Sequence, residues 1–302
     1  MTNLPLDVLA VYGAAIVWLA LLVNDARRDA YRASLWFGLA FLLALNLRYL
    51  VDGAPDAIAF FVSIYDVFDH LGLGASQTAP ALATCPDNNC SLWGARYTDH
   101  ASWGVAFHDR FLNGPAVRSY LLYAHLTFNS IVFVLMHVQL ARPGGAGGAR
   151  GHGVLGRVSF VLLTLGTGCA VWLAAELGPV SAYGGALSKY GFWFMSACVY
   201  GCAVAGVIAI RGGDAARHRV WMFRFAGSMW GAFWLFRVML VVTGPLFRAW
   251  ETVSLLLSIW LSAPLGILIA EILRRRWDRR ASGAPAPAGA VAWAGSRRDV
   301  AG

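Results

Sequence analysis

Residues 213–224 read GDAARHRVWMFR, and from Trp221 the chain runs on as WMFRFAGSMWGAFWLFRVMLVV to Val242. The first stretch gathers arginine, histidine and aspartate. The second is apolar and about as long as one helix that crosses the hydrocarbon core of a bilayer. Arg224 and Arg237 nevertheless lie within the apolar stretch. This combination predicts a membrane-spanning helix that begins at a charged connection.

Apolar segments of this length recur along the whole chain. Of the 302 residues, 58% are hydrophobic and 13% are charged, which is about half the charged fraction of a soluble domain. Because unpaired backbone groups are costly in lipid, such segments should be helices. The sequence therefore predicts an all-α, seven-helix transmembrane bundle with spans at about 7–23, 34–51, 119–140, 154–175, 190–210, 222–243 and 252–273.

The basic residues indicate how the bundle is oriented. With the N-terminus outside, the inner connections and the C-terminal end hold Arg27, Arg28, Arg32, Arg142, Arg150, Arg157, Arg211, Arg217, Arg219 and the run RRRWDRR. The short outer connections hold only Lys189 and Arg248. Since cytoplasmic loops carry an excess of Lys and Arg, we expect the N-terminus outside and the C-terminus inside. The net charge of +8 then reflects anionic lipids at the inner face, and it needs no nucleic-acid partner.

The chain is expected to form a single membrane domain over residues 1–280, followed by a disordered tail at 281–302 that is rich in Pro, Gly and Ala. Residues 52–118 form an extracytoplasmic loop or cap between the second and third helices. This loop contains Cys85 and Cys90 in the sequence TCPDNNCS. In an acidic, extracytoplasmic loop, such a pair favours a disulfide bond over a reduced metal site.

The opening stretch is interpreted as the inner connection between the fifth and sixth helices. Asp214 precedes the sixth helix, where an acid complements the positive end of the helix dipole. Arg217, Trp221 and Arg224 have i, i+4, i+7 spacing, so they share one face that can anchor the helix at the headgroups. Glu271, near the inner end of the seventh helix, is the expected partner of Arg224 or of the arginine run.

Four stretches carry a family resemblance: GHGVLGRVS (151–159), the GG…YGFW region (184–193), AIRGGDAARHRVWMFR (209–224) and LLLSIWLSAPLGILIAE (255–271). They resemble a bacterial family of predicted membrane proteins that is classed only as a domain of unknown function. Its members show H-R-x-L-G-R opening one helix and G-D-x-x-x-H-R-x-W-M-x-R opening another, with an earlier histidine near the outer end of a helix.

The positions that match this pattern are His125, His152, Arg157, Asp214, His218 and Arg224, whereas Gly153 stands where the family has Arg. The resemblance covers about residues 119–273. It implies a multi-pass protein of the bacterial cytoplasmic (inner) membrane, and no established activity comes with it.

Two arginines inside the spans are candidate substrate-binding residues, because ionisable groups in a membrane are costly and often functional. Arg237 lies about 20 Å along the sixth helix from Arg224, at 1.5 Å per residue, and so toward the outer side. Arg48 lies near the outer end of the second helix. Together they could hold a carboxylate, a phosphate or a lipid headgroup. The alternative is a structural role, in which each arginine pairs with carbonyls or an aspartate or extends to the headgroups. For Arg48 this structural role is favoured.

The outer side also gathers side chains that could bind a metal. Asp66, Asp69 and His70 have i, i+3, i+4 spacing in segment 57–72, which is too short to span and fits an amphipathic interfacial helix. His100 and His108 follow in the outer loop, and His125 stands about one turn into the third helix. Carboxylates and imidazoles at one depth suit Zn, Fe, Mn or Cu. Solvated loop histidines are the alternative interpretation.

A b-type haem ranks below a metal ion, because it needs two axial histidines that face each other at one depth. The best-placed pairing is His137 with His152 or His218, at the inner surface. The leading hypothesis is therefore a membrane-embedded, metal-dependent oxidoreductase that acts at the outer face on a small anionic or lipid-like substrate. The alternatives are a non-catalytic carrier or binder of a small anion, and a membrane scaffold. No catalytic residue and no oligomeric state follow from the sequence.

Overall fold

The computed structural model describes residues 6–28, 31–70, 111, 114–141, 148–176, 185–246 and 251–281. Within these ranges the regular structure is helical and contains no strand. Seven helical stretches are long and apolar enough to cross a membrane. The predicted all-α fold with seven candidate spans is therefore confirmed.

Each predicted span overlaps a helical stretch of the structure. In chain order the helices are α1 (Leu6–Arg28), α2 (Arg32–Val51), α3 (Ala54–His70), α5 (Ala116–Ala141), α6 (Gly148–Ala175), α7 (Gly185–Arg211), α8 (Ala215–Trp230), the π-helical turn η3 (Gly231–Leu235), α9 (Phe236–Leu246) and α10 (Glu251–Ala281). Helices α8, η3 and α9 follow one another without interruption, and together they make the sixth span.

Most helices extend beyond the apolar runs that predicted them. Helix α6 begins at Gly148 rather than 154, and α10 continues through Ala281 rather than ending at 273. Backbone hydrogen bonds do not stop at the boundary of an apolar run, and side chains spaced i, i+4 support the polar turns. In α10, Arg274 donates to Asp278 and Arg275 donates to Glu271. The rest of the predicted tail, residues 282–302, lies outside the described residues.

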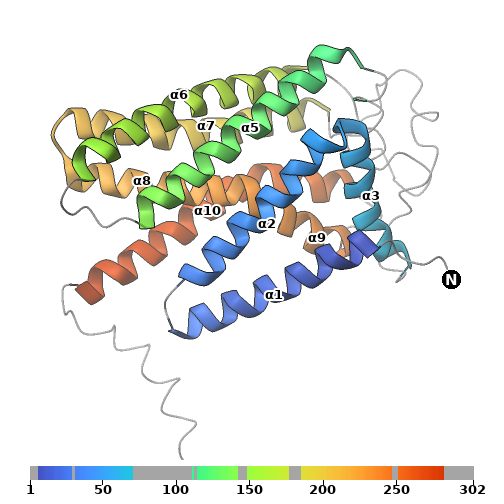
Figure 1. The fold of residues 1–302 in the computed structure, drawn as a ribbon, viewed down its shortest axis with the longest axis horizontal. Helices are drawn as coiled ribbons and strands as arrows, with labels where there is room; N and C mark the ends of the chain where they lie inside the picture. Colours follow the sequence, from blue (N-terminus) through green and yellow to red (C-terminus); the bar gives the residue numbers. More distant parts are fainter. Residues whose placement is uncertain are drawn as a thin grey trace, which may run out of the picture.

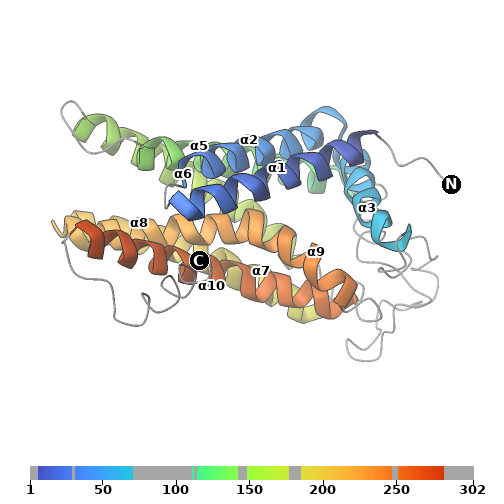
Figure 2. The same ribbon diagram turned by 90° about the horizontal axis from the view of Figure 1, so that it is seen from below.

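The spanning helices lie along a common direction and form two groups (Figure 1). Figure 2 shows α1, α2 and α5 on one side and α7, α8, α9 and α10 on the other. The most extensive helix contacts are those of α5 with α6, α8 with α10, and α7 with α8. We call the end that holds Arg28, Arg32, Arg211 and Ala281 the arginine-rich end, and the end that holds Leu6, Val51 and α3 the opposite end.

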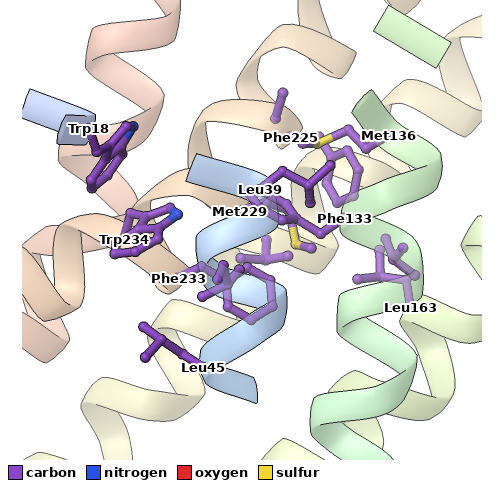
Figure 3. Packing of buried hydrophobic residues seen from close by; sticks show 14 of the residues in the cluster. Trp18, Leu39, Leu45, Phe133, Met136, Leu163, Phe225, Met229, Phe233 and Trp234 are labelled. Atoms are coloured by element: carbon purple, nitrogen blue, oxygen red, sulfur yellow. The ribbon is translucent and has the colours of Figure 1, made fainter. Parts of the chain in front are cut away.

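The core between the two groups is built from large apolar side chains of α2, α5 and α8 (Figure 3). Leu42, Phe133 and Met229 are at most 2% exposed. At its edge, Trp18 and Trp234 lie with ring centroids 4.2 Å apart. Their indole nitrogens donate to backbone carbonyls of α2, at Ser34 and Gly38 respectively. Through these hydrogen bonds, the two tryptophans attach α1 and the sixth span to α2.

Helices α8 and α10 approach so closely that only glycine fits at their contact. A Cβ atom on Gly227 would collide with the carbonyl oxygen of Gly266, and one on Gly231 with that of Ser262. Gly227 and Gly231 are four residues apart and so lie on one face, the small-xxx-small pattern that brings membrane helices together. This contact joins two helices, α8 and α10, of the group that α7, α8, α9 and α10 form.

The charged connection between α7 and α8 is shorter than the sequence suggested, because α8 is already helical from Ala215. Gly213 has φ +79°, the left-handed conformation that commonly ends a helix. The side chain of Asp214 accepts a 2.8 Å hydrogen bond from the backbone N–H of Arg217, which caps α8. The prediction that Asp214 complements the start of this helix is confirmed.

Helix α3 corresponds to the predicted helix at 57–72, but it starts at Ala54. Figure 1 shows it at the opposite end, steeply inclined to the spans. The hydroxyl of Tyr12 donates to the carbonyl of Ile64, and the backbone N–H of Ala54 donates to the hydroxyl of Tyr123. These bonds attach α3 to α1 and α5. Its location at a lipid interface stays a prediction.

Candidate functional site

Arg48 is engaged by two aspartates. Its Nη1 lies 2.9 Å from Asp7 Oδ2 and its Nε lies 3.0 Å from Asp52 Oδ2. Its guanidinium carbon also lies 3.6 Å from the ring centroid of Phe60. This is the aspartate pairing that the sequence favoured for Arg48. The guanidinium serves to join α1, α2 and α3, and its role in holding an anion gains no support.

Arg237 lies in a different setting, directly after the π-helical turn η3. A π turn holds an extra residue, so the residues after it rotate by about 100° relative to a continuous α-helix. Such turns are frequent at functional sites. Nη1 of Arg237 donates to the carbonyl of Phe233.

His125 lies deeper than its predicted place one turn into the third helix, because α5 begins at Ala116. Its Nδ1 lies 3.0 Å from the carbonyl oxygen of Gly166 on α6 and 2.9 Å from Asn129 Nδ2. Gly166 has to be small here, since a Cβ atom would lie 2.8 Å from Asn129 Oδ1. His125 is therefore a hydrogen-bonded bridge between α5 and α6.

His125, Gly166 and Arg237 occupy corresponding positions along their helices. Each is nine residues from the terminus of its helix at the opposite end, in α5, α6 and α9 respectively. At 1.5 Å per residue this is about 13 Å along each helix. The imidazole and the guanidinium thus both lie in the half of the bundle farther from the arginine-rich end.

Uncharged polar side chains link this region to α2. Asn46 Nδ2 donates a 2.9 Å hydrogen bond to Ser130 Oγ, and both residues are buried. Among the described residues, Asn46 Oδ1 is buried and has no hydrogen-bond partner; a buried acceptor left unpaired costs about 1–3 kcal/mol. We call the following residues the polar layer: Asn46, His125, Asn129, Ser130 and Arg237.

Sequence reasoning identified only His125 and Arg237 in the polar layer. Asn46, Asn129 and Ser130 were missed because uncharged side chains hardly alter the apolar character of a span. The available signal was the presence of asparagine inside segments long enough to cross a membrane, since polar side chains there form hydrogen bonds between helices.

Most candidate ligands of the predicted outer metal site lie outside the described part of the chain. Asp66, Asp69 and His70 lie in the last turns of α3, but their side chains are outside the described part of the chain, as are His100 and His108. Among the residues that are described, no group of three or more His, Cys, Asp or Glu could hold a metal ion. The metal site stays a prediction.

The predicted disulfide also falls in this part of the chain. Cys85 and Cys90 both lie outside the described residues. The disulfide bond between them therefore stays a prediction.

At the arginine-rich end, the predicted charge partners are confirmed. Arg224 Nε lies 3.4 Å from Glu271 Oε2, and Glu271 also pairs with Arg274 and Arg275. The guanidinium of Arg224 lies 4.7 Å from the ring centroid of Trp221, as their shared face predicts. These contacts join α8 to α10, so Arg224 has a structural role.

The histidines of this end do not pair as the haem hypothesis expected. His137 is buried, with Nδ1 2.7 Å from the carbonyl oxygen of Phe133 and its ring among Trp36, Phe133 and Trp230. His152 instead meets His218, with ring centroids 6.3 Å apart. Arg157 is exposed on α6. The structure thus brings together two of the matched family positions, His152 and His218.

No protein-family model, curated protein or solved structure matches the chain. The family resemblance therefore stays an expectation. The functional argument rests on the residues of this chain and their geometry.

Proposed function

We propose that this protein binds a small anion in the polar layer of its membrane domain, with Arg237 as the main ligand. The observation that carries the proposal is the position of Arg237 just after a π turn inside the sixth span, in the same half of the bundle as His125 and Gly166. An arginine inside a span costs about 2.5–3.5 kcal/mol on insertion scales, and residues of this kind commonly serve function.

The chemistry of the polar layer suits an anion with two or more oxygens. A guanidinium presents several N–H donors in one plane and matches carboxylate or phosphate oxygens. Its attraction for an anion is stronger in an apolar surrounding than in water. The buried amide of Asn46 has a carbonyl oxygen that no described residue pairs with, and it can accept from a hydroxyl of the bound molecule. A hydroxy acid or a phosphate ester therefore combines the required groups.

The orientation is part of the same proposal. The arginine clusters at one end of the bundle favour placing that end in the cytoplasm. The polar layer then lies in the half of the bundle nearer the extracytoplasmic side of a bacterial cytoplasmic membrane. Anionic lipids would contact the arginine-rich end, and the small anion would reach Arg237 from the other side.

The test is thermal stabilisation of the detergent-purified chain by a panel of acetate, lactate, malate, inorganic phosphate and glycerol phosphate. We expect at least one of them to raise the melting temperature, because a ligand that binds only the folded state stabilises it. Arg237→Gln should lose this response, whereas Arg237→Lys should keep part of it because the charge is retained. Arg48→Gln is the matched control, and it should respond like the wild type.

Two results would contradict the proposal. One is a wild-type chain that no anion of the panel stabilises. The other is a full response in Arg237→Gln. Uptake of the stabilising anion into proteoliposomes then separates a carrier from a binding protein.

A further inference from the structure

His152 and His218 come from distant parts of the sequence and meet at the arginine-rich end. His152 lies in the first turns of α6 and His218 in the first turn of α8. Their ring centroids are 6.3 Å apart, and the ring planes are at 88° to each other. The two imidazoles are therefore neighbours that do not stack.

The hydrogen bond of His218 determines which of its nitrogens is free. Nδ1 lies 2.8 Å from the carbonyl oxygen of Gly206 on α7. A carbonyl oxygen only accepts, so Nδ1 carries a proton, and in the neutral imidazole the lone pair is on Nε2. Metal-binding histidines almost always donate their other N–H to a carbonyl or carboxylate in this way, which sets the orientation of the ring. The neutral ring of His218 therefore offers Nε2 to a metal ion.

The separation of the rings fits two ligands of one ion. A metal lies about 2.0–2.1 Å from an imidazole nitrogen, and that nitrogen about 1.1 Å from the ring centre, so the two centroids are separated by about 5.2 Å for a tetrahedral angle and about 6.4 Å for a linear one. The observed 6.3 Å is at the wide end of this range. A small rotation of His152 would close the angle.

His152 has room for this movement. Its side chain is exposed at the surface of α6. In the described part of the chain, no third His, Cys, Asp or Glu joins the pair. An ion held here would keep open positions for water or another ligand, unlike a closed structural zinc site.

The geometry points to a two-histidine site for a transition-metal ion, of the Cu²⁺, Ni²⁺ or Zn²⁺ class, between α6 and α8 at the arginine-rich end. Imidazole nitrogen suits these ions, whereas Mg²⁺ and Ca²⁺ prefer oxygen ligands. The site lies away from the polar layer and uses none of its residues. It does not depend on the anion-binding proposal.

The experiment is a Cu²⁺ titration of the chelator-treated, detergent-purified full chain, isolated through a tag that contains no histidine. Electron paramagnetic resonance reports whether nitrogen ligands bind the ion. We expect His152→Phe and His218→Phe each to weaken the binding of one equivalent of Cu²⁺ by roughly tenfold or more. Phenylalanine retains an aromatic ring at the contact between the helices, so the variants separate metal binding from ring packing.

The matched control is the pair of variants His70→Ala and His108→Ala, which address the predicted metal site in the outer loop. If copper binding is lost in His70→Ala and His108→Ala but kept in both phenylalanine variants, the inference is wrong. Absence of copper binding in the wild type would also overturn it. So would a haem absorption band in the purified chain that His152→Phe and His218→Phe both remove, because a haem would then occupy the two imidazoles.

Discussion

At the scale of single residues, several polar side chains form hydrogen bonds between the spans. Asn46 reaches Ser130 across the interface between α2 and α5, and His125 reaches Gly166 across that between α5 and α6. Hydrogen bonds of this kind are worth about 0.6 kcal/mol on average in membrane proteins. Their main consequence is to fix the depth at which α2, α5 and α6 meet one another.

Gly166→Ala should disturb the polar layer directly. The added methyl group would lie 2.8 Å from Asn129 Oδ1, so either the amide or the whole of α6 has to shift, at a typical cost of about 1–3 kcal/mol. We expect a lower melting temperature in detergent and weaker anion binding. Gly168→Ala is the control on the same helix, because a Cβ atom there meets nothing within 4 Å. Equal stability of the two variants would contradict the close contact of α5 with α6 at Gly166.

At the scale of the elements, short sequence features determine where helices begin and how closely they pack. Gly213 and Asp214 end α7 and start α8 within two residues. Gly227 and Gly231 then allow α8 and η3 to pack against α10 without any side chain between the backbones. The path of the sixth span, and with it the place of Arg237, depends on this contact.

Gly227→Ala should destabilise the protein more than Gly166→Ala does. Its Cβ atom would collide with the backbone carbonyl of Gly266, and a backbone atom of a packed helix cannot move aside as a side chain can. We expect a lower melting temperature and faster proteolysis of α10 in detergent. Gly201→Ala on α7 is the control, since a Cβ atom there has open space. Wild-type stability of Gly227→Ala would show that α8 and α10 are farther apart.

At the scale of the whole molecule, the two ends of the bundle differ in chemistry. The arginine-rich end holds the ion pairs of Glu271 and Asp278 and the two imidazoles of His152 and His218. The opposite half holds the polar layer. Which end faces the cytoplasm decides which compartment supplies the anion and which supplies the metal ion.

The orientation can be measured with reporter fusions. A fluorescent protein at the C-terminus should fold and fluoresce, because we expect that end in the cytoplasm. Alkaline phosphatase inserted in the connection at 177–184 should be active, because that connection is expected outside. The reverse pattern would exchange the compartments assigned to the polar layer and to the histidine pair. It would leave the geometry of both sites unchanged.

The sequence predicted those features that depend on neighbouring residues. The seven spans follow from long apolar runs, and the start of α8 from Asp214 ahead of an apolar segment. The partner of Arg224 also followed, because Glu271 is the acid at the corresponding end of the next span. In each case the signal lies within one helix or at a position that the crossing topology alone specifies.

By itself, then, the sequence determined that this is an all-α chain with seven segments able to cross a membrane, because the bilayer imposes length and polarity on each span independently. Only the tertiary structure decided that Arg48 is neutralised by Asp7, that His125 meets Gly166, and that His152 meets His218. These relations depend on the rotation and depth of each helix about its own axis. Contacts between residues far apart in the chain, such as Gly227 with Gly266 and Trp234 with Gly38, set that rotation and depth.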